Sequence, residues 1–541
     1  MSAIENNAVT DKTQVYIVGG GIAGLASAAF AIRDGNIPGK NIHIFEVMNT
    51  LGGALDGAGT PQAYICRGAR KYNYPAFNCT WNLLATIPSL SDPEKTVMKE
   101  IVEYNKLNPK NVQTRIIDKN MNRDYVKNWG PEQSDVPDVI KLMSTPEKMI
   151  EDRKISDWFR PSFFSSNFWI VYCSMFGFEP WHCVIEMKRY LLRFRHDGYR
   201  TVQGGGEVST PYNQYDSMIL PIRRWLEDRD VNFKMGCKVT DLGFKPSADE
   251  LTIDRIHYIG NGKKEEVALN EGDIVIATIG SIVADSRSGS MTEPARLERG
   301  KLDGSWTLWE NIIKSVKEQR SSIDGDEMIE PTELGNPSVF CDHIDETKWV
   351  VFSVTATDRK FLELFEEFTG NKDGQADLVT FKDSPWLMSI HMPAQPQFPD
   401  QPDDVLFWMG YGLIQNKEGD YVKKKMADCN GGEILTEICN QFGFTDELPH
   451  IRNTSTCIPT MNPYDTAHFM PRKNSDRPRV VPEGSTNLAF VGQYVEIPDE
   501  CVMLVESSIR SAQTAVYTLL NVDKMVPPIH GLQQEVEDSG S

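Results

Sequence analysis

The sequence predicts an α/β fold built on a discontinuous Rossmann-like domain, with an inserted α+β domain and a mainly helical part. Three observations lead to this prediction. A short apolar strand, a glycine-rich turn and a helix follow one another near the N-terminus. Further apolar strands, at residues 273–279 and 486–491, each run into a turn that contains glycine. These three segments, taken in chain order, suit one buried parallel sheet that the chain leaves and re-enters.

The N-terminal segment contains every part of a dinucleotide-binding βαβ unit. Residues 15–18 are apolar and β-prone, and Gly19–Gly24 follow them directly. Residues 25–33 predict a helix whose alanines allow close packing on the sheet, and a second strand spans residues 41–45. Glu46 ends that strand and can accept hydrogen bonds from both hydroxyls of a ribose. This arrangement predicts a dinucleotide site.

Each glycine of the turn has a separate physical task. Gly19 permits the tight turn, Gly21 lets the backbone approach a pyrophosphate, and Gly24 lets the helix lie close to the strand. Ile22 and Ala23 lie in the turn just before the helix, whose start offers free N–H groups and a partial positive charge to the phosphates. The turn and the helix start are therefore predicted to bind the phosphates of the cofactor.

Later segments resemble large two-domain FAD enzymes of the amine oxidase and phytoene desaturase type. A second glycine pair in Leu51–Ala54 follows Glu46 closely, and residues 273–281 resemble a later strand and turn of those enzymes. Residues 486–493 and a helix over residues 506–520 resemble their closing strand and helix. The cofactor is therefore expected to be FAD. The further cofactor-binding candidates are Gly53, Ile279, Gly280, Ser281 and Gln493 in these segments, and Val239 elsewhere in the expected FAD-binding segment 205–285.

The chain of 541 residues is long enough for two to four domains at roughly 150 residues each. We expect the FAD-binding domain to be assembled from three separate segments and the substrate-binding domains from the two segments between them. The expected boundaries are a disordered leader at 1–12, the FAD-binding domain at 13–95, 205–285 and 445–522, the substrate-binding domains at 96–204 and 286–444, and a tail at 523–541.

Composition excludes several other classes of protein. The formal net charge of −20 argues against a nucleic-acid partner, which needs a local excess of Lys and Arg. The ten cysteines are scattered without a CxxC pair, so neither a structural metal nor a disulfide scaffold is expected. The first fourteen residues are polar, and no run of eighteen uncharged apolar residues occurs. A cytoplasmic protein is expected, with peripheral membrane contact left open.

A second set of motifs runs through the chain and includes Arg67–Arg70, Cys79–Leu83, Phe178–His182, Lys188–Tyr190, Tyr212–Ser217, Trp408–Leu413 and Phe469–Arg472. This set resembles the oleate hydratase family of fatty-acid double-bond hydratases, also called the myosin-cross-reactive antigen family. The resemblance runs from about residue 13 to about residue 520. It implies an FAD-dependent enzyme without net redox change, which adds water across a carbon–carbon double bond of a free fatty acid. It also implies a homodimer that can associate with membranes.

The resemblance assigns catalytic roles to two positions. Tyr190 matches the tyrosine that donates a proton to the alkene, although a phenol with a pKa of about 10 is a weak acid for this task. Lys71 stands where the family has a water-activating glutamate. In the same loop Arg67, Gly68 and Ala69 match residues against the flavin, with alanine in place of the family's second glycine. From Arg67 to Asn82 there is no Asp or Glu.

An ordinary lysine, with a pKa of about 10.4, is protonated at pH 7 and cannot take a proton from water. Three interpretations of Lys71 stay open. It is a base whose pKa is lowered by its surroundings, a cation that positions the substrate carboxylate or the flavin, or a sign that the enzyme protonates an alkene without delivering water. The last would make the protein a double-bond isomerase or a cyclase, acting on a lipid or on a polyene or isoprenoid substrate.

Two further classes of function are also left open. One is a redox flavin oxidase or desaturase, and the other is a catalytically inactive protein that binds lipid or FAD. The family counterpart of residues 453–459 carries polar groups near the substrate carboxylate, so Thr454 and Thr456 are candidate substrate-binding residues. His182 lies in a family motif, but we interpret it as structural.

Overall fold

A five-stranded parallel sheet carries the N-terminal glycine turn. In the computed structural model, which describes residues 12–68, 70–124, 130–195, 207–324, 330–376 and 378–529, the strand order is β20-β13-β1-β2-β9. The strands come from three distant segments, which confirms the predicted discontinuous α/β domain. Their bounds are β1 (Val15–Val18), β2 (Ile42–Glu46), β9 (Asn232–Met235), β13 (Ile274–Thr278) and β20 (Leu488–Val491). Ala69 and most of the expected leader and tail lie outside the described residues.

Two helices cover this sheet next to the glycine turn. Helix α1 (Ile22–Arg33) begins directly after Gly21, and ten of its twelve residues are buried. Helix α15 (Val505–Leu519) follows β20 and packs against α1. Small alanine side chains on α1 permit this close contact, because they add little bulk between the two helix axes.

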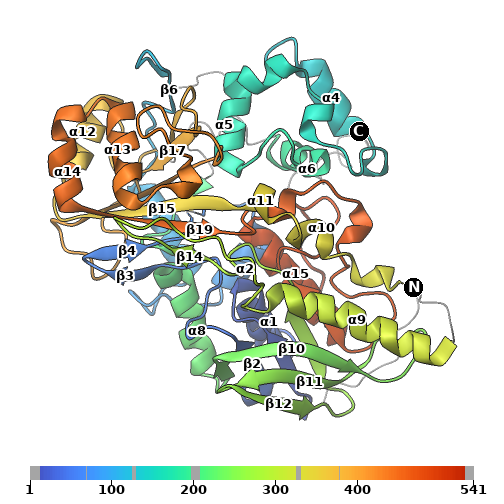
Figure 1. Ribbon diagram of the computed structural model, residues 1–541. Helices are drawn as coiled ribbons and strands as arrows, with labels where there is room; N and C mark the ends of the chain where they lie inside the picture. Colours follow the sequence, from blue (N-terminus) through green and yellow to red (C-terminus); the bar gives the residue numbers. More distant parts are fainter. Residues whose placement is uncertain are drawn as a thin grey trace, which may run out of the picture.

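An antiparallel three-stranded sheet lies beside the parallel sheet, at the bottom of Figure 1. It consists of β10 (Cys237–Phe244), β11 (Ile253–Gly260) and β12 (Lys263–Ala268). Helix α9 (Ser305–Asp324) packs against β10. This helix was expected in a substrate-binding segment, but its packing places it beside the nucleotide-binding part of the chain.

The third sheet has eight strands and joins the two segments expected to bind substrate. Strand β6, from the first of these segments, pairs in parallel with β16 from the second. The central strand β15 is buried along all eight residues and lies between β18 and β19. The strand order is β14 (Arg287–Ser288), β19 (Ser455–Asn462), β15 (Trp349–Ala356), β18 (Leu406–Gly412), β17 (Met388–His391), β16 (Val379–Phe381), β6 (Ile116–Ile117) and β7 (Arg123–Asp124).

Strand β19 departs from the expected boundary at residue 445. It pairs with β15 from Ser455 to Asn462, so it belongs to the eight-stranded sheet and not to the parallel sheet. The physical reason is its partner, because eight antiparallel pairs with a fully buried strand satisfy its backbone. The chain returns to the parallel sheet only at β20.

Three helices form a separate layer at the top of Figure 1. They are α4 (Val136–Ser144), α5 (Asn167–Phe176) and α6 (Val184–Phe194). Helix α5 begins at Ser166, whose hydroxyl accepts a hydrogen bond from the Trp169 N–H, and ends at Gly177 with φ +76°. Aromatic side chains from α5, α6 and Phe469 fill the core of this layer. Within the described ranges, no helix combines the length and the apolar composition that a bilayer span needs.

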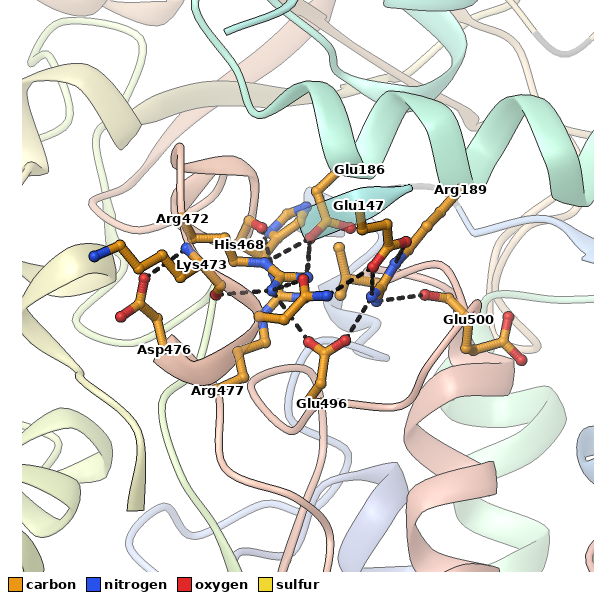
Figure 2. Close-up of polar contacts among 12 residues, drawn as sticks. Glu147, Glu186, Arg189, His468, Arg472, Lys473, Asp476, Arg477, Glu496 and Glu500 are labelled. Atoms are coloured by element: carbon orange, nitrogen blue, oxygen red, sulfur yellow. Dashed lines mark hydrogen bonds and ion pairs between the residues drawn. The ribbon is translucent and has the colours of Figure 1, made fainter. Parts of the chain in front are cut away.

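A buried ion-pair network joins the helical layer to the C-terminal part of the chain (Figure 2). Glu186 on α6 is fully buried, and one of its carboxylate oxygens lies 2.8 Å from Arg472 Nη2 and 3.0 Å from Arg477 Nη1. Arg189, one turn further along α6, pairs with Glu147 at 2.8 Å and with Glu496 at 2.5 Å. Four segments that are distant in sequence are therefore held together by charge.

The arginines also determine the charge state of Glu186. Burial by itself raises the pKa of a carboxyl, but Arg477, Arg472 and Arg189 outweigh that effect and lower the pKa of Glu186 to about 2. The carboxylate therefore stays ionised at neutral pH. Removing one partner of such a network leaves uncompensated buried charge, which is strongly destabilising.

We expect Glu186→Gln to lower the free energy of unfolding by about 3–5 kcal/mol, because Arg472 and Arg477 lose a shared buried counter-charge. Urea denaturation of the FAD-free protein measures this loss. Since the pKa of Glu186 is lowered in the folded state, the stabilisation is present at neutral pH and is lost as the pH falls toward 2.

Glu103→Gln is the matched control, because Glu103 forms a largely exposed ion pair with Lys95 at 2.9 Å. This variant should unfold at nearly the same urea concentration as the parent protein. Equal urea midpoints for the two variants would contradict the importance of the buried network.

Candidate active site

The glycine turn lies at the carboxyl edge of the parallel sheet and opens toward a cavity. Gly19 has φ +98°, a conformation that L side chains rarely adopt, and its N–H donates to Phe45 O at 2.8 Å. A Cβ on Gly24 would lie 2.0 Å from Gly19 O, so the turn itself requires glycine there. A Cβ on Gly21 would meet only Gly53 Cα, at 3.9 Å. The protein has room for a side chain at position 21, and that room belongs to the cavity.

The cavity beside this turn measures about 500 Å³. Glu46 lines it, with one carboxylate oxygen accepting from Gly20 N at 2.7 Å and the other accepting from Met48 N at 2.8 Å. Burial raises the pKa of Glu46. The open position at Gly21, the acid at the end of β2 and the adjacent helix start fit a dinucleotide cofactor.

Most of the cofactor-binding candidates line this cavity. They are Gly19, Gly21, Ile22, Ala23, Glu46, Gly53, Arg67, Val239, Gly280, Ser281 and Gln493. Ile279 is the exception in its segment, because its side chain is fully buried in the core of the domain. Gly68 does not line the cavity either, and Ala69 lies outside the described residues.

Residues 503–505, which lead into α15, belong to the cavity although they were not among the predicted cofactor-binding residues. Met503, Leu504 and Val505 line the cavity together with Ser508 in the first turn of that helix. Met503 has φ +69°, a backbone conformation that is strained for any residue other than glycine. The predicted helix over residues 506–520 was the available signal, because the residues just before a helix bring its free N–H groups to a ligand.

The loop at residues 67–71 forms a wall between two cavities. Arg67 lines the first cavity, where its Nε lies 2.6 Å from Asp56 Oδ2 and its Nη2 donates to Gly53 O at 2.8 Å. Arg70 lines both this cavity and a second one of about 490 Å³. Lys71 lines the second cavity only. The position that departs from the family motif therefore faces away from the cofactor cavity.

The second cavity has a polar, cationic wall. Lys71 Nζ and Lys110 Nζ each donate to Ser209 Oγ at 3.0 Å, so the two ammonium groups converge on one hydroxyl. Among the described lining residues, Asp373 is the one carboxylate. Asparagine and glutamine amides supply further hydrogen-bonding groups to the same cavity. This chemistry suits an anionic ligand such as a carboxylate.

Tyr190 lies apart from both cavities. It is fully buried on α6, against the rings of Phe176, Phe178 and Phe469. Its hydroxyl donates to Val502 O at 2.5 Å, and burial raises the pKa of the phenol well above its ordinary value. The structure does not bring Tyr190 and Lys71 to one cavity. The backbone of Val502 connects Tyr190 to the cofactor cavity, because the next residue lines it.

The two threonine candidates line neither cavity. Thr454 ends helix α14 (Leu448–Thr454), and its hydroxyl donates to His450 O at 3.1 Å. Thr456 pairs with Thr355 across the eight-stranded sheet. The register of β19 places them at the end of the strand away from residues 460–462, so neither lines the 490 Å³ or the 500 Å³ cavity.

His182 has the geometry of a structural residue. It is fully buried, its Nδ1 accepts a hydrogen bond from Glu179 N at 2.8 Å, and burial lowers its pKa well below the ordinary value. A neutral imidazole that accepts a backbone N–H fixes the turn before α6. It lines neither of the two cavities.

Comparison with known proteins identifies relatives along nearly the whole chain. The model of the MCRA family matches residues 12–517. The oleate hydratase of Streptococcus pyogenes serotype M49 (strain NZ131) is 35% identical over 536 residues, covering 96% of this chain and 87% of that protein. The linoleate hydratase of Lactiplantibacillus plantarum is 28% identical over 554 residues, covering 94% of each chain.

Solved structures resemble the fold at low sequence identity. Cyclohexylamine oxidase from Brevibacterium oxydans IH-35A superimposes with a TM-score of 0.55 and 11% identity, covering 94% of this chain and 99% of that chain. At this identity the likeness concerns the fold alone. It agrees with the predicted amine oxidase type of α/β architecture.

We expect Gly21→Val to weaken FAD binding at least tenfold while leaving the melting temperature of the FAD-free protein unchanged. The new side chain projects into the cavity and meets no protein atom closer than ordinary contact at its Cβ. Fluorescence titration with FAD and thermal unfolding measure the two effects.

Gly24→Val is the contrasting variant. Its Cβ would overlap Gly19 O at 2.0 Å, so it should lower the melting temperature even without cofactor. Unweakened FAD binding by the Gly21→Val protein would show that the cofactor phosphates lie elsewhere.

Proposed function

Because the chain belongs to the MCRA family, we propose that it is an FAD-dependent hydratase that adds water across the double bond of an unsaturated fatty acid. The observation that carries this proposal is the loop at residues 67–71, which separates a dinucleotide cavity from a cationic cavity suited to a carboxylate. An oleate hydratase and a linoleate hydratase are among the relatives that cover nearly the whole chain.

FAD is held in the first cavity by the glycine turn, by Glu46 at the ribose and by the residues before α15. When bound, FAD supplies a flavin ring that forms one wall of the reaction site, and hydration transfers no net electrons to it. The division of the chain into an FAD-binding part and substrate-binding parts belongs to the same proposal. Arg70, which lines both cavities, is the described side chain best placed to contact both cofactor and substrate.

Hydration requires an acid and a base on the two sides of an alkene. One alkene carbon gains a proton, the other bonds to the oxygen of water, and that water loses a proton. We assign the acid to Tyr190 from the family resemblance. Burial raises the pKa of its phenol, so the hydroxyl keeps its proton at neutral pH, and the same shift makes it a weaker acid than a free phenol. Its bond to Val502 O holds it one residue from the cavity wall at Met503.

The position of Lys71 favours one of the three interpretations of this residue. It shares the second cavity with Lys110 and does not line the cofactor cavity, so a cation that positions the substrate carboxylate is the role that its surroundings support best. The long, flexible side chain of lysine delivers a compact charge to such a group.

A double-bond isomerase is the second candidate. The absence of Asp and Glu from residues 67–82 favours it, because an isomerase does not need a base that activates water. The homodimer and the contact with a membrane surface remain predictions from the family resemblance.

We expect the protein with FAD, oleic acid and ¹⁸O-labelled water to yield a product heavier than oleic acid by one labelled water, and Tyr190→Phe to abolish its formation. Loss of a general acid lowers the rate by about 10²–10⁴-fold. Mass spectrometry of the extracted fatty acids measures both results.

Tyr172→Phe is the matched control, because Tyr172 is a buried phenol in the same aromatic cluster. It should retain most of the activity. A product of unchanged mass with a new retention time would support isomerisation, and bleaching of the flavin by substrate without oxygen would support a redox enzyme. An unchanged hydration rate in the Tyr190→Phe protein would refute the assignment of the acid.

We expect Lys71→Gln to raise the KM for oleate about tenfold with little change in kcat. The variant loses a charge-assisted bond to the substrate carboxylate, which contributes roughly 1.5–3 kcal/mol. Steady-state kinetics with oleate and with methyl oleate, which has no carboxylate charge, measure the effect.

The KM for methyl oleate should be the same in the Lys71→Gln and parent proteins. Lys263→Gln, at an exposed position on β12, controls for the loss of one positive charge. A large fall in kcat with an unchanged KM would instead identify Lys71 as a base.

A further inference from the structure

Hydration needs a group that accepts a proton from water, and the described carboxylates lining the cofactor cavity are engaged elsewhere. Asp56 accepts from Arg67 through both oxygens. Asp285 accepts from two backbone N–H groups, one to each oxygen. Glu46 is bonded in the same way, and Asp303 interacts with it at the ribose end of the cavity. Asp56 and Asp285 therefore have both oxygens occupied, and Glu46 and Asp303 lie together at the ribose end of the cavity.

Asp465 is a carboxylate of a different kind. It follows β19, three residues beyond Asn462, and only 6% of it is exposed. Its Oδ2 accepts from Asn462 Nδ2 at 2.8 Å, and within the described part of the chain its Oδ1 accepts no hydrogen bond. Asn462 Oδ1 in turn accepts from Ser286 Oγ at 2.7 Å, and Ser286 lines the cofactor cavity. Two hydrogen bonds therefore connect Asp465 to the cavity wall.

The loop that carries Lys71 also faces Asp465. Arg70 and Arg67 both interact electrostatically with the carboxyl, and Tyr494 faces it from the segment after β20. No described hydrogen bond joins Asp465 to either arginine, so these interactions act across a gap. One oxygen of the carboxyl thus has no hydrogen-bond donor among the described residues, and two arginines that line the cofactor cavity lie nearby. Asp465 itself lines neither cavity, and it lies behind the wall to which Ser286 belongs.

The surroundings of Asp465 bring the pKa of its carboxyl close to neutral pH. Burial raises the pKa of Asp465 to about 6, although the bond from Asn462 and the charges of Arg70 and Arg67 act in the opposite direction. A general base works best when its pKa lies near the pH of operation, because it is then both deprotonated and able to hold a proton. An exposed aspartate, with a pKa of about 3.9, would be a weaker base.

We propose that Asp465 is the proton acceptor for the attacking water. This inference rests on the proposed function. The acid adds a proton to one alkene carbon, the oxygen of water bonds to the other carbon, and one proton of that water passes to the Asp465 carboxylate. The proton then returns to the acid through solvent, so that the sum is one alkene plus one water giving one alcohol.

Asp465→Asn tests the proposal in the full-length protein with FAD and oleic acid. We expect kcat to fall about a hundredfold or more, with the affinity for FAD unchanged. The parent protein should show a kcat that rises with pH through about 6 and then levels, because only the carboxylate accepts a proton. The residual rate of the Asp465→Asn protein should lack this rise. Asp465→Glu should retain part of the activity together with the rise.

Thermal unfolding gives a second measurement that does not depend on turnover. A carboxyl whose pKa is raised in the folded state destabilises the protein as the pH rises from about 4 to about 6, because folding then opposes its ionisation. Relative to the parent protein, Asp465→Asn should therefore gain melting temperature between pH 4.5 and pH 7. Asp476→Asn, at a carboxyl that also has a raised pKa but lies beside Arg472 and Lys473 rather than beside the 67–71 loop, should leave the pH profile of kcat unchanged.

The outcomes separate this inference from the proposed function. Formation of the hydroxy fatty acid by the parent protein, with loss of both the rate and the pH rise in Asp465→Asn, supports it. Formation of the product at an undiminished rate by Asp465→Asn overturns the inference and leaves the proposed function intact. Absence of the hydroxy fatty acid from the parent protein overturns the proposed function and this inference together.

Discussion

The buried carboxylate of Glu186 holds the helical layer against the C-terminal part of the chain. A lone charge in that position would be prohibitively costly, and it is stable only because Arg472 and Arg477 approach it from another segment. Through Arg189 the same helix is fixed to Glu496, which lies in the chain between the cavity-lining residues Gln493 and Met503. The helix that carries Tyr190 and the segment that leads into α15 are therefore positioned by one set of ion pairs.

Two buried carboxyls of this protein have opposite pKa shifts because their neighbours differ. Glu186 has arginines within ion-pair distance, and its pKa is lowered to about 2. Asp465 has arginines only across a gap, and its pKa is raised to about 6. The first group is a permanent charge that supports the fold. The second can exchange a proton near neutral pH, which is a property of reacting groups more often than of structural ones.

Different residues of the loop at 67–71 line different cavities. Arg67 is fixed by Asp56 and faces the cofactor cavity, whereas Lys71 faces the second cavity beside Lys110. A substitution at position 71 thus changes the second cavity and leaves the cofactor-binding wall intact. This explains how a chain can keep the dinucleotide site of its family while a charge is reversed a few residues away.

The sequence by itself determined the parallel sheet, the glycine turn and the acid at Glu46, because these features depend on residues that are close in the chain and on backbone geometry that few side chains permit. Only the tertiary structure decided that β19 joins the eight-stranded sheet, that Tyr190 is enclosed by aromatic rings, and that Asp465 faces the 67–71 loop. The reason is physical: the partner of a strand and the neighbours of a buried charge come from distant segments. No local pattern around residue 465 records the two arginines nearly four hundred residues earlier that share its surroundings.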